Sequence, residues 1–394
     1  MSVKDRWLLP DGIEEVLPDE ALRIETMRGR VLDLFSSWGY ERVMPPMIEF
    51  LDSLLTGVGR EMDIQTFKIT DQVSGRMMGI RPDMTPQAAR IDAHYLKRSG
   101  PVRLCYLGAV LRTRPDEFGG SREPLQLGAE LFGDSSRASE AEIVSLMIAT
   151  LQLFGVTRTH LDLGHVGIFR GLATAAGIEA QQEKELFDAI QRKAGTEVAK
   201  LLGDWDVDKK LASMLVSLVK LNGGREVLDE AAKKLNGAPK PVLDALTGLN
   251  ELVEALADEI PEQELFFDLA ELSGYSYYTG AVFSAFVPGH GRAIAKGGRY
   301  DGIGNAFGRD RPATGFGADL KQLLELSDIT IRQSAGILAP AEPDQDVRAL
   351  IDRLRTEGER VVRLMPGQKA DANELNCDRQ IVNEKNNWIV KSIK

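Results

Sequence analysis

Apolar residues recur every three or four positions near the start of the chain, which places them along one face of a helix. The residues of this stripe are Ile24, Met27, Val31, Leu34, Phe35 and Trp38. The pattern predicts an amphipathic helix over 18–38, which ends at Gly39. The run 40–46 that follows predicts a short strand, which the paired prolines Pro45 and Pro46 close.

Between residues 66 and 132 the pattern changes to short apolar runs that Gly, Pro and Asp separate, as in antiparallel sheets. We predict strands here over 66–70, 76–80, 102–107, 110–113 and 126–132. A helical pattern returns over 139–154. Further strands are predicted over 265–269, 277–286 and 292–295.

Two other stretches differ in texture from this sheet. The segment 167–260 is almost wholly helical in pattern, which predicts an inserted helical subdomain. From residue 334 short strand patterns alternate around a helix at 347–356, after a linker rich in Ala and Pro. We therefore predict an α+β fold in three parts. These are a core of 1–166 and 261–333, a helical insert of 167–260, and a small C-terminal α/β domain of 334–394.

The composition is that of an ordinary globular protein, because 43% of the 394 residues are hydrophobic and 27% are charged. The formal net charge of −11 provides no overall basic field to attract nucleic acid. No run approaches the roughly 20 apolar residues of a membrane span, and the first residues lack the apolar core of a signal peptide. We expect a cytoplasmic protein that binds no membrane.

Cysteine and histidine are placed without any pattern of metal ligands. Cys105 and Cys377 lie far apart, so neither a disulfide scaffold nor a zinc site is expected. The four histidines also lack metal-ligand spacing, and His290 lies between glycines, which predicts a turn. We expect no metal and no cofactor.

A first candidate binding segment is Arg81-Pro82-Asp83-Met84-Thr85-Pro86. In an extended segment, Asp83 and Thr85 point to the same face. A carboxylate beside a hydroxyl suits an ammonium group, which has only donors. The same residues also suit the capping of a helix that begins at Pro86. The residues alone leave both interpretations open.

A second candidate lies on the predicted strand 126–132. Gln126 and Glu130 are four residues apart, so they share a face, with Gly128 between them. The glycine leaves open space above the sheet, as a ligand platform requires. Glu130 can accept a hydrogen bond from an imidazole N–H. The alternative is a solvent-facing strand edge.

Several segments, taken in their order, resemble the catalytic core of histidyl-tRNA synthetases. They are 18–46, Arg81-Pro82-Asp83-Met84-Thr85, 107–132, Tyr277-Tyr278-Thr279-Gly280, Gly297-Gly298-Arg299-Tyr300-Asp301-Gly302 and 315–322. The resemblance implies the fold of class II aminoacyl-tRNA synthetases, an antiparallel sheet flanked by helices. The first segment is similar to the motif that forms the dimer interface in that class, which implies self-association as a dimer.

The resemblance also implies a pocket for histidine. Carried over by position, Asp83 and Thr85 hold the ammonium group and Arg112 holds the carboxylate. Gln126 contacts the ammonium or the carboxylate group of the histidine. Glu130 and Tyr278 read the imidazole, and Tyr277 lies beside them.

The departures from the synthetase pattern fall at positions that handle the nucleotide. Ser273 and Gln322 stand where the synthetases carry arginines, Arg114 replaces a carboxylate, and Gly120 replaces another arginine. Adenylation needs positive charge where negative charge develops. The resemblance therefore implies that histidine binding is retained and amino-acid activation is lost, so we expect no enzymatic activity.

This combination is similar to the regulatory subunits of ATP phosphoribosyltransferase. The tail after residue 334 is shorter than the roughly 100 residues of a full anticodon-binding domain, which fits that family. The resemblance implies a non-catalytic subunit that binds L-histidine and no tRNA. It also implies a hetero-octamer with a short catalytic subunit, which needs the regulatory chain for activity and is inhibited by histidine in the first step of histidine biosynthesis.

Two alternatives remain from the sequence. One is a free-standing histidine sensor that acts on another partner. The other is an active histidyl-tRNA synthetase, which the residues at 273 and 322 disfavour.

Overall fold

The computed structural model describes residues 7–57, 59–115, 120–271, 274, 277–341, 344–369, 371–385 and 387–393. The chain forms two compact units. One unit comprises Met1–Val16 and Ile24–Ile329, and the other comprises Leu17–Arg23 and Thr330–Lys394. The predicted domain boundaries at 166, 260 and 333 stay predictions.

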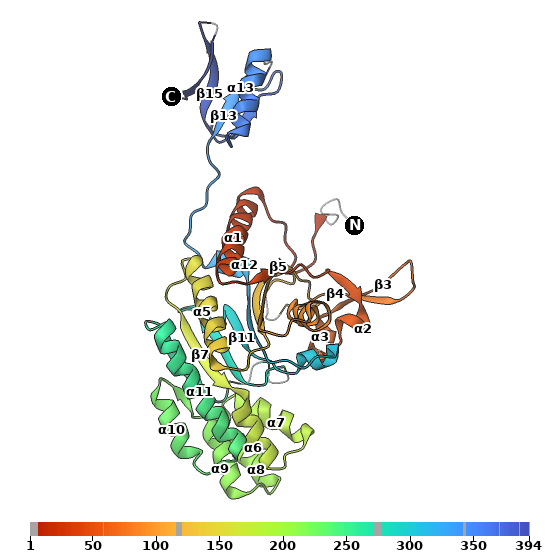
Figure 1. Cartoon of the computed structure of the whole chain (residues 1–394), viewed down its shortest axis with the longest axis vertical. Helices are drawn as coiled ribbons and strands as arrows, with labels where there is room; N and C mark the ends of the chain where they lie inside the picture. Colours follow the sequence, from red (N-terminus) through yellow and green to blue (C-terminus); the bar gives the residue numbers. More distant parts are fainter. Residues whose placement is uncertain are drawn as a thin grey trace. The chain divides into compact units, whose positions relative to one another are not determined.

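The first unit is built on a nine-stranded sheet (Figure 1). Its strands, in spatial order, are β1 (Glu41–Arg42), β5 (Val102–Ala109), β6 (Leu125–Phe132), β12 (Ala313–Asp319), β11 (Ala295–Arg299), β10 (Ala281–Phe286), β7 (His160–His165), β9 (Glu264–Asp268) and β8 (Asn222–Gly223). The neighbours are antiparallel except β1–β5 and β7–β9, which are parallel. The predicted antiparallel sheet is thus confirmed over its centre.

Helices cover one face of this sheet. Helix α5 (Arg137–Leu153) packs on β6, β11 and β12, and α11 (Lys240–Glu259) packs against α5. The predicted amphipathic helix is confirmed as α1 (Pro18–Ser37). Its Phe35 meets Phe316 of β12 edge to face, with ring centroids 6.0 Å apart.

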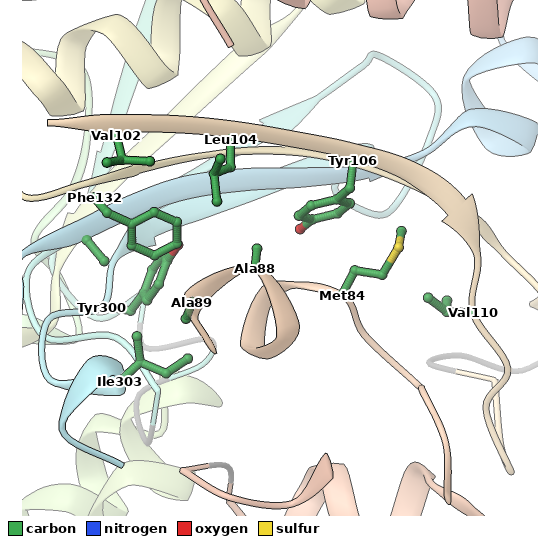
Figure 2. Packing of buried hydrophobic residues seen from close by; sticks show 11 residues of the cluster. Met84, Ala88, Ala89, Val102, Leu104, Tyr106, Val110, Phe132, Tyr300 and Ile303 are labelled. Atoms are coloured by element: carbon green, nitrogen blue, oxygen red, sulfur yellow. The ribbon is translucent and has the colours of Figure 1, made fainter. Parts of the chain in front are cut away.

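The opposite face of the sheet carries a shorter helical segment. Helix α4 (Thr85–Arg90) continues into the π-helix η2 (Ile91–Leu96). Figure 2 shows Ala88 of α4 facing Leu104 and Tyr106 of β5, in a buried cluster with Phe132 and Tyr300. Small alanines let the helix approach the strands closely, and this packing fixes the residues just before α4 above the sheet.

Smaller elements complete the first unit. A three-stranded sheet has the order β2 (Ile48–Phe50), β4 (Met77–Ile80), β3 (Phe67–Thr70). The short helices are α2 (Leu51–Leu54), α3 (Arg60–Gln65), α12 (Leu320–Glu325) and the 3₁₀ turn η3 (Ile303–Phe307).

The segment predicted as a helical insert consists mainly of helices joined by short turns, and it also contains the two residues of β8. Its helices gather at one end of the first unit (Figure 1). They are α6 (Val166–Ala175), α7 (Ala180–Gln191), α8 (Gly195–Asp204), α9 (Lys209–Leu218), α10 (Glu226–Lys234) and α11. Helix α11 packs on α6 as well as on α5, which joins this group to the sheet.

The second unit contains a four-stranded sheet with one helix. The strand order is β14 (Val361–Arg363), β13 (Gly336–Ala339), β15 (Cys377–Glu384), β16 (Asn387–Ser392). Helix α13 (Gln345–Thr356) buries Val347 and Ile351 in a core with Ile337 and Ile381. This is the small α/β fold that the alternating pattern of the tail predicts, with the additional strand β15.

Some predicted strands were wrong. The run 110–113 forms no strand, because Val110 N–H donates to Pro124 and Leu111 N–H donates to Arg81, and only Arg112 makes a bridge, to Thr66. The strand predicted at 292–295 lies at Ala295–Arg299. Strands β2, β7 and β12 have no counterpart in the prediction.

Within the described part of the chain, none of the helices combines the length and the apolar character needed to cross a bilayer.

Candidate functional site

The loop before α4 is held by a pair of amide–carboxylate contacts. Asp83 Oδ1 accepts from the backbone N–H of Thr85 at 2.7 Å and from Gln126 Nε2 at 3.0 Å. Gln126 Oε1 in turn accepts from the Met84 N–H at 3.0 Å. Asp83 is half-buried and supports the first turn of α4, and Gln126 orients it. Its interpretation as a ligand for an ammonium group stays a prediction.

Thr85 begins a chain of hydroxyl groups that runs across the sheet. Its Oγ1 lies 2.8 Å from the hydroxyl of Tyr106, and that hydroxyl donates to Glu130 Oε1 at 2.8 Å. Tyr300 donates to the other oxygen, Glu130 Oε2. Thr85 on α4 and Glu130 on β6 are therefore linked through Tyr106, and sequence reasoning missed both tyrosines.

Sheet register explains why this row of hydroxyl groups fits above the strands. On β5 and β6, Tyr106 lies opposite Gly128, and on β6 and β12, Glu130 lies opposite Gly315. A Cβ added at Gly128 would overlap the Tyr106 ring, and one added at Gly315 would overlap the Glu130 carboxylate. The glycines leave the space that the larger side chains fill.

Glu130 is the most perturbed acid of the site. Its exposed fraction is 1%, and burial raises its pKa to about 8. The hydrogen bonds from Tyr300 and Tyr106 act in the opposite direction, because they favour the ionised carboxylate. Near neutral pH the protonated and ionised forms are therefore close in free energy.

Tyr277 and Tyr278 form an aromatic wall beside Glu130. The Tyr277 ring stacks on Tyr300, with centroids 5.0 Å apart and planes at 22°, and meets Tyr278 at 75°. Among the described residues, the buried hydroxyl of Tyr277 has no hydrogen-bond partner. Burial raises the pKa of both tyrosines, so both remain neutral donors. Tyr278 lies against Gly298, where a Cβ would come within 2.8 Å of its ring.

The opposite end of the site carries Arg112 and Asp319. Arg112 Nε donates to the backbone carbonyl of Pro82 at 3.2 Å, which anchors the arginine beside the loop of Asp83. Asp319 accepts from the N–H groups of Leu125 and Lys321, and burial raises its pKa while Arg112 lowers it. Asp319 pairs with Gln126 in the sheet, a neighbour that only the register reveals.

Gln322, one of the positions predicted to replace an arginine of the synthetases, already has a partner. Its Nε2 lies 3.0 Å from His290 Nε2, and Arg292 Nε donates to the same nitrogen at 3.1 Å. His290 Nε2 therefore acts as an acceptor. The position thus presents a neutral amide bound to the ring of His290. Ser273, another of these positions, lies outside the described residues.

A cavity of about 660 Å³ lies elsewhere in the first unit, beside β2 and η2. Its lining includes Phe50, Arg90, His94, Tyr95 and Phe307. None of the residues that the sequence predicts for ligand binding lines it.

Comparison with known proteins places the chain in a family. Residues 12–323 match the family model of histidyl-tRNA synthetase, and residues 334–391 match that of the ATP phosphoribosyltransferase subunit HisZ C-terminal domain. The chain is 56% identical to the ATP phosphoribosyltransferase regulatory subunit of Pseudomonas syringae pv. syringae (strain B728a), over 99% of both chains. The chain belongs to the family of ATP phosphoribosyltransferase regulatory subunits.

Other relatives agree with this family. The regulatory subunit of Pseudomonas fluorescens (strain Pf0-1) is 55% identical over the full length of both chains. A solved structure titled as an ATP phosphoribosyltransferase regulatory subunit/histidyl-tRNA synthetase from Bacillus halodurans has a TM-score of 0.81 at 28% identity, covering 94% of this chain and 95% of that one. The sequence-based prediction of the family is confirmed.

A more distant structure bears on the fold alone. Histidyl-tRNA synthetase from Nostoc sp. PCC 7120 has a TM-score of 0.77 at 17% identity, covering 98% of this chain and 97% of that one. The class II synthetase-like fold of this regulatory-subunit family member is thereby confirmed.

Proposed function

We propose that this regulatory subunit binds L-histidine between α4 and β6, and that the short catalytic subunit of ATP phosphoribosyltransferase needs it for activity. Histidine in the site then biases the complex toward a less active state, which gives feedback inhibition of the first step of histidine biosynthesis. The observation that carries the proposal is the series of hydrogen-bonded hydroxyl groups between Thr85 and Glu130, because it links acceptors suited to an ammonium group and to an imidazole N–H.

The chemistry of histidine suits the arrangement at each end. Its ammonium group donates to Asp83 and Thr85, and its carboxylate meets Arg112. A neutral imidazole has one N–H donor and one bare nitrogen. Glu130 accepts from the first, and the hydroxyl of Tyr277, which has no partner among the described residues, donates to the second. Tyr278 packs beside the ring.

The proposal includes the absence of catalysis by this chain. At position 322 the chain has a glutamine bound to His290 in place of the arginine of the synthetases. A neutral amide supplies no charge to a developing adenylate. Histidine-dependent exchange of pyrophosphate into ATP should therefore be absent, and a measurable exchange rate would support the synthetase alternative.

The test of the main proposal is phosphoribosyl transfer from phosphoribosyl pyrophosphate to ATP by the cognate short catalytic subunit, with and without this chain. We expect a marked increase in rate on addition of the chain, and inhibition on titration with histidine. If a competent catalytic subunit is unaffected while the chain still binds histidine, the chain is a histidine sensor for another partner.

Glu130→Gln tests the site within that assay. The amide replaces one acceptor oxygen by a donor, so histidine affinity should fall by roughly 10-fold or more. Inhibition should weaken by the same factor, while activation of the catalytic subunit is retained. Titration calorimetry that gives the wild-type affinity for this variant would remove Glu130 from the site.

Assembly is a further part of the proposal. Three exposed apolar side chains, Met44, Met47 and Ile48, lie at the end of the segment that resembles the dimer motif or just after it. Such a patch is typical of a protein interface. We propose a dimer of this chain that joins catalytic subunits in a hetero-octamer in the cytoplasm, without tRNA. Native mass spectrometry of the chain alone and with the catalytic subunit measures both stoichiometries.

A further inference from the structure

The hydroxyl of Tyr106 occupies the one position where the two ends of the site meet. Tyr106 is fully buried, and its oxygen lies 2.8 Å from Thr85 Oγ1 and 2.8 Å from Glu130 Oε1. A phenol has one proton and can donate only once. The direction of one of these hydrogen bonds therefore decides the direction of the other.

When Glu130 is ionised, the directions are determined. The carboxylate only accepts, so Tyr106 donates to Oε1 and Tyr300 donates to Oε2. The single proton of Tyr106 is then used, and Thr85 must donate to Tyr106. The lone pairs of Thr85 Oγ1 are left to accept from the ligand, beside the Asp83 carboxylate. In this setting the Thr85 end favours an ammonium group.

When Glu130 carries a proton, the hydrogen bonds between Glu130, Tyr106 and Thr85 can reverse their direction. The acid donates from Oε1 to Tyr106, the phenol proton turns to Thr85, and the Thr85 hydroxyl proton points to the ligand. A donor in that position opposes an ammonium group, which itself only donates. The groups that face Glu130 are the hydroxyls of Tyr106, Tyr300 and Thr85, with the Asp83 carboxylate near enough to disfavour a second negative charge.

We propose that Tyr106 is a positioning residue that couples the two ends of the site, so that a ligand ammonium at Asp83 and Thr85 and a ligand N–H at Glu130 strengthen each other. The pocket then selects molecules that carry both donors over molecules that carry one. This inference rests on the proposed function, since it concerns the same site, and it adds the basis of ligand selectivity. Tyr300 also donates to Glu130, but the contacts of the described residues link only Tyr106 to Thr85.

The difference between the two tyrosines provides a matched pair of variants. Tyr106→Phe and Tyr300→Phe each remove one hydroxyl donor from Glu130, and only Tyr106→Phe also breaks the link to Thr85. The ligands are L-histidine and imidazolepropionate, which is histidine without its amino group. Isothermal titration calorimetry on the whole chain gives the ratio of the two affinities for the wild type and each variant.

The coupling predicts that this ratio falls by roughly 10-fold in Tyr106→Phe, the size of one charge-assisted hydrogen bond. In Tyr300→Phe both affinities fall, and the ratio falls less than in Tyr106→Phe, because the hydrogen-bonded link from Glu130 to Thr85 remains. General damage to the pocket also weakens both ligands together, so it does not mimic the expected result. An unchanged ratio in Tyr106→Phe, or an equal fall in both variants, overturns the coupling and leaves histidine binding in place.

A second measurement needs no variant of Tyr106, in case that variant does not fold. In the wild type the affinity ratio should rise between pH 6 and pH 8, as ionised Glu130 turns Thr85 into an acceptor. Each affinity is first corrected for titration of the ligand's own imidazole. A ratio that stays flat overturns the coupling. If the wild type binds neither ligand at any pH, both the coupling and the proposed function fail.

Discussion

At the residue scale, Glu130 combines full burial with hydrogen bonds that stabilise its charge. A buried carboxyl prefers to be neutral, whereas two hydroxyl donors prefer it ionised. Burial wins, and the pKa rises to about 8. Tyr106 and Tyr300 therefore stabilise the ionised form of Glu130 through their hydrogen bonds.

The raised pKa of Glu130 makes a prediction about stability. The folded chain keeps this proton up to about pH 8, whereas the unfolded chain loses it near pH 4.5. Between these values the native state binds more protons, so this residue lowers the free energy of unfolding as pH rises from 5 to 8. We expect the decrease to be about 2–4 kcal/mol larger in the wild type than in Glu130→Gln.

Urea titrations of both proteins at intervals from pH 5 to pH 8.5, without histidine, measure this difference. Every other titrating group is shared, so Glu130→Gln is the control for the remaining pH dependence. Parallel curves for the two proteins would show that Glu130 keeps an ordinary pKa.

At the element scale, strand β12 forms the floor beneath Glu130. Gly315 lies opposite Glu130 in the register, and Gly317 lies on the same face of the same strand. A Cβ at Gly315 would overlap the Glu130 carboxylate, whereas the nearest atom to a Cβ at Gly317 is 3.6 Å away. The strand therefore has room for a side chain at Gly317 and none at Gly315.

Gly315→Ala and Gly317→Ala turn this contrast into a test. Gly315→Ala should displace Glu130, weaken histidine binding and lower the free energy of unfolding by about 1–3 kcal/mol. Gly317→Ala should change stability by less than about 1 kcal/mol, because ordinary van der Waals contact is available there. Thermal unfolding and calorimetry on both variants measure the two effects. Equal behaviour of the variants would contradict the register described for β6 and β12.

At the scale of the whole molecule, a buried ion pair joins segments far apart in the chain. Arg311, just before β12, donates to both oxygens of Asp92 on η2, at 2.8 and 3.0 Å. The exposed fractions are 7% for Arg311 and 2% for Asp92. Arg311 also donates to the carbonyl of Gly100. The pair holds the continuation of α4 against the sheet, and so helps to fix the loop of Asp83.

Asp92→Asn should therefore destabilise the chain. The amide leaves the guanidinium of Arg311 buried without a counter-charge, which costs about 3–5 kcal/mol. The double variant Asp92→Asn with Arg311→Met removes the stranded charge and should recover part of the loss. Denaturant unfolding of the two variants and the wild type gives the comparison. A double variant that is less stable than Asp92→Asn would mean that Arg311 acts mainly through Gly100.

The same long-range packing explains which strands could be predicted. The alternation of polar and apolar residues along 126–132 predicts β6, because it depends on neighbours two residues apart. Strand β12 contains Gly315 and Gly317 on the face below Glu130, and glycines obscure that alternation. The run 110–113 looks like a strand locally, yet its backbone groups bond to Pro124 and Arg81 instead of to a neighbouring strand.

The sequence by itself determined the family and the class II synthetase-like fold, because these rest on local motifs and local periodicity. The same motifs predict the ligand-binding residues Asp83, Arg112 and Glu130, which stay predictions. Only the tertiary structure revealed that Gln126 orients Asp83, that Gln322 binds His290, and that hydroxyl groups link Thr85 to Glu130. The physical reason is that these contacts cross between strands and helices. Their partners are set by sheet register and by the packing of α4, and neither is encoded in the spacing of nearby residues.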